Sequence, residues 1–250
     1  MAKSIVSLPI LCLLLLLSFN SGGLLKLANG QDKTWCVAKP SSNDTALASN
    51  INFACSQLGT LGLSCNMIQQ AGICYYPNTL INHASVVMNY YYQALGRHTW
   101  NCDFGGSALI TISDPSYGSC QYGWEIAMAK SMVSLSILCL LLLLSFSSGG
   151  LLKLPNGQDK TWCVAKPSSN NTALASNIDF ACSQLGNLGL SCDMIKEDGI
   201  CFNPNTLINH ASVVMNSYYY AFGRNIWNCD FSGSALITIS DPSYGSCQYP

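Results

Sequence analysis

Six cysteines, present twice, constrain this chain more than any other feature. The first set is Cys36, Cys55, Cys65, Cys74, Cys102 and Cys120, and it recurs 127 positions later as Cys163, Cys182, Cys192, Cys201, Cys229 and Cys247. An even, compact set of cysteines after an apolar leader is typical of a small secreted module held by three disulfides. Each block spans fewer than ninety residues, a size at which a hydrophobic core benefits from covalent reinforcement. The sequence therefore predicts two small disulfide-rich modules.

The beginning of the chain predicts a secretory signal peptide over residues 1–30. A basic head at Lys3 precedes an apolar run from Ile5 to Phe19, and small residues follow as far as Gly30. Cleavage after Gly23 or after Gly30 satisfies the small-residue rule, and both positions stay open.

Residues 128–250 repeat residues 1–123 with 20 differences, and the repeat includes the leader. The expected division is therefore a signal peptide (1–30), a first module (31–123), a linker (124–157) that contains a second signal-like segment (128–150), and a second module (158–250).

Three interpretations of the second apolar segment stay open. Two adjacent, duplicated reading frames have been joined in one gene model, or residues 132–152 are retained as a membrane span. A retained span would leave the second module in the reducing cytosol, where its disulfides should not form. In the third interpretation, signal peptidase cleaves the chain internally, or the two modules remain tethered outside the cell.

Helical spacing and turn residues predict two helices and one strand in each module. The first helix is expected to start at Asn43 or Asp44 and to end at Gly59, with Leu47, Ile51, Ala54, Cys55 and Leu58 on its buried face. A second helix should run from about Pro77–Thr79 to Gly96. The β-branched segment 107–112 predicts a strand before the Asp114–Pro115 turn.

Individual residues of these elements have expected places. On the second helix Tyr91 should point inward, with Tyr90 and Tyr92 on the flanks of the apolar stripe. Cys65 and Cys74 flank a short loop and are close enough to pair with each other. Asn43 and Asn170 begin Asn-X-Thr sequences and are predicted N-glycosylation sites.

Composition narrows the range of ligands. The net charge is -1 and only 9% of residues are charged, so no basic surface is large enough to hold a nucleic-acid backbone. A neutral surface that carries aromatic and amide side chains suits an uncharged polar ligand such as a glycan.

Six motifs of the first module, repeated with changes in the second, carry a family resemblance. They are Thr34-Trp-Cys-Val-Ala38, Cys74-Tyr-Tyr-Pro-Asn-Thr79, His83-Ala-Ser85, Asn89-Tyr-Tyr-Tyr92, Cys102-Asp-Phe-Gly-Gly-Ser-Ala108 and Asp114-Pro-Ser-Tyr-Gly-Ser-Cys120. In their order and cysteine spacing they resemble the plant X8 domain, also called carbohydrate-binding module family 43. The resemblance covers both cysteine blocks.

The resemblance implies a small disulfide-rich α+β module, here duplicated, with two helices, a small antiparallel sheet, long coil segments and three disulfides. It also implies first-to-fifth, second-to-sixth and third-to-fourth pairing, which spacing alone could not supply because six cysteines allow 15 connectivities. Applied to this chain, the pairing that the resemblance implies is Cys36–Cys102, Cys55–Cys120 and Cys65–Cys74 in the first module, and Cys163–Cys229, Cys182–Cys247 and Cys192–Cys201 in the second.

The function that the resemblance implies is non-catalytic binding of β-1,3-glucan, including callose, in the plant cell wall or apoplast and at plasmodesmata. It implies a glycan partner, with no cofactor, no metal and no nucleic acid. Only three residues follow Cys247, so the sequence shows no lipid-anchor signal. The alternative function is a disulfide-rich structural or protein-interaction module of the secretory pathway.

Glucan recognition requires exposed aromatic rings and a few polar partners, because unpaired buried hydroxyls are costly. Tyr90, Tyr92 and Tyr117 are the favoured exposed platforms, whereas Trp100 and Phe104 have the alternative of packing on a disulfide and Trp35 is expected in the core. The candidates in the first module are Tyr75, Tyr76, His83, Asn89, Tyr90, Tyr92, Trp100, Asp103, Phe104 and Tyr117, and those in the second are Tyr219, Tyr220, Trp227, Asp230, Phe231 and Tyr244.

Two further expectations concern differences between the copies and catalysis. Ser217 replaces Tyr90 in the second copy, which predicts a weaker or reshaped second site. The shared carboxylates do not form the pair that a glycosidase needs, and the modules share only one histidine position, His83 with His210. The sequence therefore predicts neither an enzyme nor a metal site.

Overall fold

The computed structural model describes residues 33–123 and 160–250, and both ranges belong to one compact unit. The signal peptide (1–30), the second signal-like segment (128–150) and the candidate span (132–152) lie outside the described residues. No helix within the described ranges is long and apolar enough to cross a membrane.

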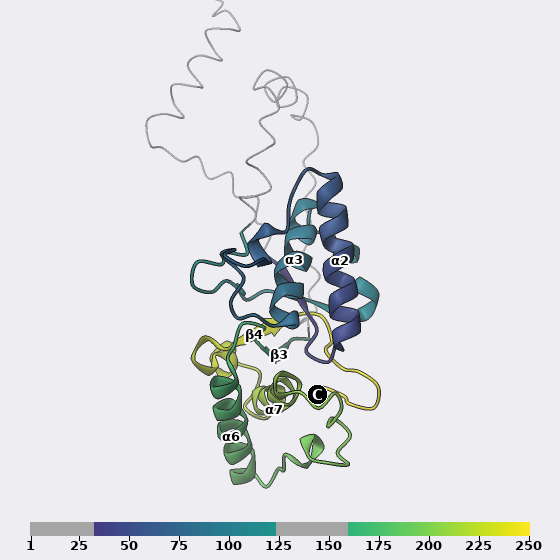
Figure 1. Cartoon of the computed structure of the whole chain (residues 1–250). Helices are drawn as coiled ribbons and strands as arrows, with labels where there is room; N and C mark the ends of the chain where they lie inside the picture. The colour runs from purple at the N-terminus through teal and green to yellow at the C-terminus, as the bar shows by residue number, and fades with distance from the viewer. Residues whose placement is uncertain (1–32, 124–159) are drawn as a thin grey trace, which may run out of the picture. The chain divides into compact units, whose positions relative to one another are not determined.

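Each module consists of two α-helices, two short strands and three 3-10 turns (Figure 1). In the first module the order is β1 (Trp35–Ala38), α2 (Asp44–Thr60), η1 (Asn66–Ile68), α3 (Leu80–Ala94), η2 (Thr99–Cys102), η3 (Phe104–Gly106) and β2 (Ala108–Thr111). In the second it is β3 (Trp162–Ala165), α6 (Asn171–Asn187), η4 (Asp193–Ile195), α7 (Leu207–Ala221), η5 (Ile226–Cys229), η6 (Phe231–Gly233) and β4 (Ala235–Thr238). This confirms the α+β fold class.

Polar side chains start both helices of the first module where the sequence predicted. The side chain of Asn43 accepts a hydrogen bond from the Ala46 amide at 2.8 Å, and that of Thr79 accepts from the Asn82 amide at 3.3 Å. Each bond satisfies an amide that has no partner inside the helix. The helix ends differ slightly from expectation, because α2 continues one residue past Gly59.

The four strands form one antiparallel sheet in the order β1-β2-β4-β3. Within the first module Trp35 pairs with Thr111 and Ala38 with Ala108, and the second module repeats this register. The sequence predicted a strand over residues 107–112. The observed strand β2 is shorter by one residue at each end and spans Ala108–Thr111.

Every residue of the four strands is buried, because both faces of the sheet are covered. On one face, Cys36 and Ile110 pack with Leu47 of α2 and with Met88 and Tyr92 of α3. On the other face, Trp35 and Leu109 pack against Tyr122, which lies in the last segment of the first module (residues 113–123, here called the C-terminal segment). The sheet and the two helices thus make a rigid frame that carries the loops η2 and η3.

The disulfides confirm one pair in each module and correct the other two. The bonds are Cys36–Cys102, Cys55–Cys65 and Cys74–Cys120 in the first module, and Cys163–Cys229, Cys182–Cys192 and Cys201–Cys247 in the second. The expected Cys55–Cys120 and Cys65–Cys74 pairs, with their equivalents Cys182–Cys247 and Cys192–Cys201, are therefore wrong.

Chain reversal after α2 explains the correction. The helix ends at Thr60, and the turn that follows brings Cys65 back to Cys55 with a Cα–Cα distance of 5.7 Å. Cys74 instead lies buried in the core beside the C-terminal segment, where its Cα is 4.8 Å from that of Cys120. Both distances fall in the range that a disulfide spans.

The orientation of the tyrosines on α3 also differs from expectation. Tyr92 is only 2% exposed and its hydroxyl lies 2.9 Å from Thr34 Oγ1, while Tyr90 is 8% exposed. Tyr91, which was expected to point inward, is partly exposed. The apolar stripe was misjudged because α3 packs against α2, β1 and η1, so that most of its circumference is buried.

Candidate functional site

An open groove lies beside α2 and α3, where the loop containing η2 and η3 passes. Its volume is about 460 Å³, within the range of about 300–1,000 Å³ that is usual for ligand sites. We call it the aromatic groove, and its lining residues are Ser49, Asn50, Phe53, Tyr91, Trp100, Asn101, Asp103, Phe104 and Gly105.

Three rings from separate elements form the apolar part of this groove. Phe53 on α2, Tyr91 on α3 and Phe104 on η3 have centroids 5.5 to 6.1 Å apart and meet edge to face. Such packing is favourable and leaves ring surface for a ligand. Phe53 is about half exposed, whereas Tyr91 and Phe104 are partly buried, so the rings are positioned by the fold rather than free in solution.

Trp100 stands in the same groove and is 71% exposed. Its indole is stacked on the His98 ring, with centroids 4.4 Å apart and planes 6° from parallel. Stacking on one face restrains the indole and leaves the opposite face open. Trp100 is therefore a surface residue and does not belong to the core.

Polar side chains are fixed next to the rings. Asn50 Nδ2 donates to Ser107 Oγ at 2.6 Å, Asn101 Nδ2 donates to the Leu95 carbonyl at 3.1 Å, and Asp103 Oδ2 accepts from the Gly105 amide at 3.1 Å. Each side chain keeps further capacity to donate or accept. The groove therefore combines ring surfaces with oriented amide and carboxylate groups, as the faces and hydroxyl rims of a sugar require.

The second module contains an equivalent groove with a volume of about 380 Å³. Eight of its nine lining positions carry the same residue as the first, including Phe180, Tyr218, Trp227 and Phe231. The exception is Ser232 in place of Gly105, and its φ of 54° lies in the left-handed region that favours glycine. Two similar grooves are thus present in one chain.

The groove does not have the residues for glycoside hydrolysis. Among its lining residues Asp103 is the single carboxylate, and Asp230 is the single one in the second module. Both hydrolytic geometries use a pair of carboxyl groups flanking the scissile bond. Within the described ranges there is also no cluster of three or more metal-ligating side chains. The lining residues of each groove therefore do not supply the two carboxyl groups that a glycosidase places around the scissile bond.

Only some of the residues predicted as a site lie in the grooves. The structure brings together Trp100, Asp103 and Phe104, and equally Trp227, Asp230 and Phe231. Asn89, Tyr90, Tyr92 and Tyr219 are buried. Tyr220 is exposed and lies against Arg224 at 5.0 Å, outside the groove.

A second group of predicted residues forms a separate cluster in the first module. Tyr75 packs edge to face on Tyr76 at 4.8 Å and lies 5.7 Å from the His83 ring. His83 Nε2 is 2.7 Å from the Tyr75 carbonyl. In the second module Phe202 and Asn203 replace the two tyrosines, and of the two ring contacts only the one between Phe202 and the His210 ring, at 5.6 Å, is kept.

Tyr117 and Tyr244 mainly support the fold. The hydroxyl of Tyr117 accepts a hydrogen bond from Asn82 Nδ2 at 2.7 Å, and Tyr244 is held in the same way by Asn209 at 2.6 Å. Burial raises the pKa of both phenols above the ordinary value for tyrosine.

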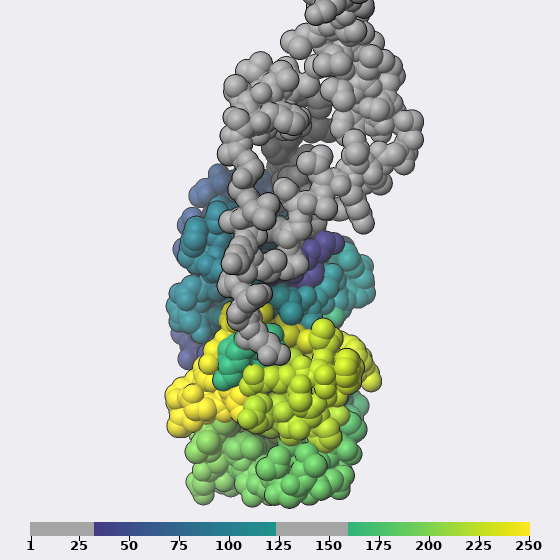
Figure 2. Space-filling model, turned by 180° about the vertical axis from the view of Figure 1, so that it is seen from behind, coloured from purple at the N-terminus to yellow at the C-terminus, as the bar shows by residue number. Residues whose placement is uncertain are grey.

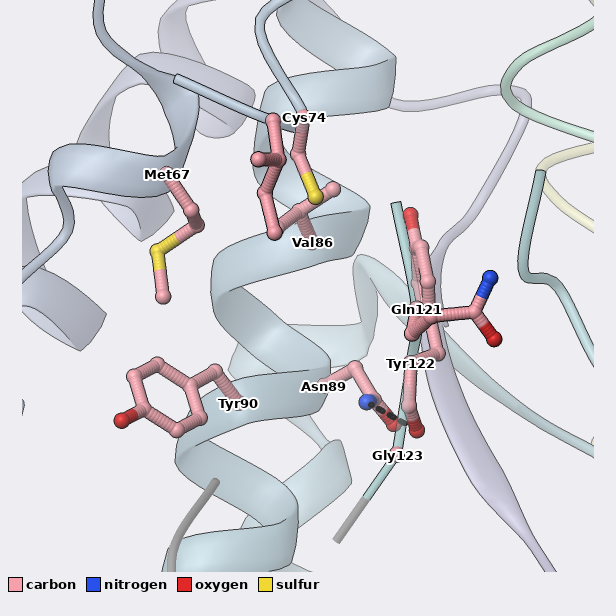
Figure 3. A pocket seen from close by; sticks show the side chains of 9 residues that line it. Met67, Cys74, Val86, Asn89, Tyr90, Gln121, Tyr122 and Gly123 are labelled. Carbon is pink, nitrogen blue, oxygen red and sulfur yellow. Dashed lines mark hydrogen bonds between the residues drawn. The ribbon is translucent and has the colours of Figure 1, made fainter. Parts of the chain in front are cut away.

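Tyr90 and Asn89 border a narrow pocket instead of an open platform (Figure 3). The pocket has a volume of about 30 Å³, which is room for one or two water molecules and not for a sugar ring. Asn89 crosses it to donate to the Tyr122 carbonyl at 3.3 Å, while its Oδ1 accepts from the Cys36 amide at 3.1 Å. Asn89 therefore ties α3 to β1 and to the C-terminal segment.

We expect Tyr90→Ser, which introduces the residue found in the second copy, to lower stability and leave glycan affinity unchanged within about twofold. Truncation of a buried aromatic side chain typically costs about 3 kcal/mol or more. Thermal unfolding and calorimetric binding to a soluble β-1,3-glucan would measure the two effects. If Tyr90→Ser lowered glycan affinity and left stability unchanged, Tyr90 would have to contact the glycan directly.

Sequence reasoning missed Phe53, Tyr91 and the amides Asn50 and Asn101. The sequence contained one signal for Phe53. This large aromatic residue lies outside the apolar stripe of α2, on a helix face where polar side chains are usual. No sequence signal placed it beside η3, about fifty residues further along the chain, because that proximity depends on helix packing.

Comparison with known families identifies the modules. The profile described as X8 domain matches residues 34–109 and 161–236, which together make up more than half of the chain. The chain belongs to the X8 family. Each X8 match contains one complete β1-to-η3 or β3-to-η6 segment, and thus all lining residues of one aromatic groove.

A pollen allergen and a callose-binding protein are among its relatives. The major pollen allergen Ole e 10 of Olea europaea is 50% identical over 103 residues, which are 41% of this chain and 81% of the allergen. Plasmodesmata callose-binding protein 1 of Arabidopsis thaliana is 37% identical over 100 residues, which are 40% of this chain and 48% of that protein.

The X8 modules also match part of longer proteins. A glucan endo-1,3-beta-D-glucosidase of Olea europaea is 49% identical over 90 residues, which are 36% of this chain but only 19% of the glucosidase. The chain therefore matches about a fifth of that enzyme.

Proposed function

We propose that this protein binds β-1,3-glucan, including callose, through the aromatic groove of each X8 module, without hydrolysing it. The observation that carries the proposal is the groove itself, in which an exposed tryptophan and three packed rings stand beside fixed amide and carboxylate groups. Rings stack on the apolar faces of sugars, and the polar groups pair with their hydroxyls.

The names of the relatives support β-1,3-glucan as the proposed glycan. One relative is named as a callose-binding protein, and several others as glucan endo-1,3-beta-glucosidases. These relatives match this chain over 88 to 100 residues, about the length of one module, so the module is the part suited to recognise the same polymer. The groove's single carboxylate supports binding without catalysis in this chain.

The disulfides support a place outside the cytosol. Six closed bridges persist in an oxidising compartment, which agrees with the predicted secretion signal and with the apoplast or cell wall as the site of action. A plasmodesmal location is suggested by the name of one relative. Asn43 and Asn170 are exposed and remain predicted glycosylation sites.

Retardation in native gels containing polysaccharide tests the proposal. The intact secreted chain should migrate more slowly in gels with soluble β-1,3-glucan than in gels with soluble mannan or with no polysaccharide. The same mobility in all three gels, from protein with all six disulfides closed, would contradict glucan binding. It would favour the alternative of a structural or protein-interaction module.

A further inference from the structure

The two modules meet along one strand edge, and the hydrogen bonds between residues 33–123 and 160–250 occur in reciprocal pairs. Thr111 of β2 lies opposite Thr238 of β4. The Ile112 amide donates to the Ile237 carbonyl at 3.0 Å, and the Ile239 amide donates to the Ile110 carbonyl at the same distance. Contacts in which residue i meets j and j meets i define a self-complementary interface.

Side chains reinforce this edge in the same reciprocal manner. The Thr111 hydroxyl donates to the Ile237 carbonyl at 2.6 Å and that of Thr238 donates to the Ile110 carbonyl at 2.7 Å. The Ile110 amide donates to Ser240 Oγ and the Ile237 amide to Ser113 Oγ, both at 2.9 Å. The buried strand edge therefore leaves none of these amides unpaired.

Two lysines extend the contact beyond the strands. Lys39 Nζ donates to the Ser243 carbonyl and Lys166 Nζ to the Ser116 carbonyl, both at 2.6 Å. Burial lowers the pKa of Lys39, and the nearby Asp241 carboxylate partly opposes that effect; Lys166 and Asp114 repeat the arrangement. Each module thus supplies one lysine and one acidic turn.

Apolar side chains on both sides of the edge belong to one core cluster. Trp35, Val37 and Leu109 of the first module share it with the equivalent residues of the second, Trp162, Val164 and Leu236. In Figure 2 yellow atoms of the second module lie directly against teal atoms of the first. Separation of the modules would open part of this cluster to water and would leave two strand edges unpaired.

The sequence along the edge is the same in both modules. Residues 107–122 are identical to residues 234–249, and Lys39 corresponds to Lys166, although the modules differ elsewhere. A second copy of either module could therefore make every contact that its present neighbour makes.

We propose that the edge formed by Ala108–Ser113 with Lys39, and by its equivalent Ala235–Ser240 with Lys166, is a self-pairing surface whose partner is another X8 module of the same sequence. Its pairing does not depend on the covalent link between the modules. Copies that arise as separate proteins, or by cleavage between the modules, associate as two-module pairs. The inference is independent of glucan binding.

Cleavage of the folded full chain tests this. A recognition sequence for a site-specific protease is placed within residues 124–159, the secreted protein is purified with its disulfides closed, and the chain is then cut. At micromolar concentration the two halves should elute together in size-exclusion chromatography. Light scattering should give the summed mass of two modules. When isotopically labelled cut protein is added, native mass spectrometry should also detect pairs of two first modules. Halves that separate while each keeps three disulfides would overturn the proposal.

Two pairs of substitutions place the contact at the strand edge. Ile112→Pro with Ile239→Pro removes the two ladder amides, and the cut protein should separate into single modules; Ile112→Val with Ile239→Val keeps the amides and should remain paired. Ser113→Ala with Ser240→Ala removes only acceptors between modules, and should weaken pairing at least tenfold even if the proline variant fails to fold. Unchanged pairing in the serine variant would exclude this edge as the contact.

Discussion

Replacement of both groove tryptophans should abolish most glucan binding. In Trp100→Ala with Trp227→Ala, we expect affinity for a short β-1,3-gluco-oligosaccharide to fall about 30-fold or more, because truncation of a central aromatic anchor costs about 2 kcal/mol or more. These side chains are 71% and 74% exposed, so their loss should leave the core unchanged. Isothermal titration calorimetry measures the affinity, and a short ligand avoids cross-linking of molecules.

The single variants separate the two sites. Each should halve the number of sites per chain and leave the affinity of the remaining site as it was, because the two grooves share eight of nine lining residues. Tyr76→Ala is the matched control, since Tyr76 is 75% exposed but lies outside the groove. If Tyr76→Ala weakened binding as much as Trp100→Ala, the cluster of Tyr75, Tyr76 and His83 would replace the groove as the candidate site in the first module.

Removal of the Cys36–Cys102 disulfide should destabilise the first module more than removal of Cys55–Cys65. The bonds close loops with sequence separations of 66 and 10 residues. Because a longer loop loses more entropy in the unfolded chain, the expected costs are about 4 and about 3 kcal/mol. The first bond also lies in the core against Ile110, so the alanines that replace it would leave space there.

Denaturant unfolding of Cys36→Ala with Cys102→Ala, and of Cys55→Ala with Cys65→Ala, measures the two effects. The wild-type chain, with all six disulfides closed, serves as the reference for both variants. Equal losses, or a larger loss for Cys55–Cys65, would mean that strain or residual structure outweighs loop entropy. Peptide mapping of the wild-type protein would also detect the expected Cys74–Cys120 bond.

The starts of the helices could be predicted from the local sequence pattern alone. Asn43 and Thr79 were recognisable as helix starts because a side-chain oxygen that caps a backbone amide acts within three residues. The family motifs likewise predicted the small α+β module and its duplication, which the structure and the X8 matches confirm. These features depend on residues that are neighbours in the chain.

The direction of Tyr91 and the partner of Cys120 were not predictable in this way. Tyr91 borders the groove because α2 and η3 leave an opening at that side of α3, and the same packing buries Tyr90 and Tyr92. Cys120 bonds to Cys74 because the C-terminal segment returns to the core beside α3. Each outcome is set by segments that lie tens of residues apart.

Two disulfide-rich X8 modules with capped helices, low charge and many aromatic residues could be predicted from the amino-acid sequence alone. The exposed aromatic side chains, the cysteine pairs within each module and the contact of the modules along identical strand edges became known only from the folded structure. Helix caps and hydrophobic periodicity act between residues that are close in the chain, whereas the groove, the disulfides and the strand edge arise where distant segments pack together.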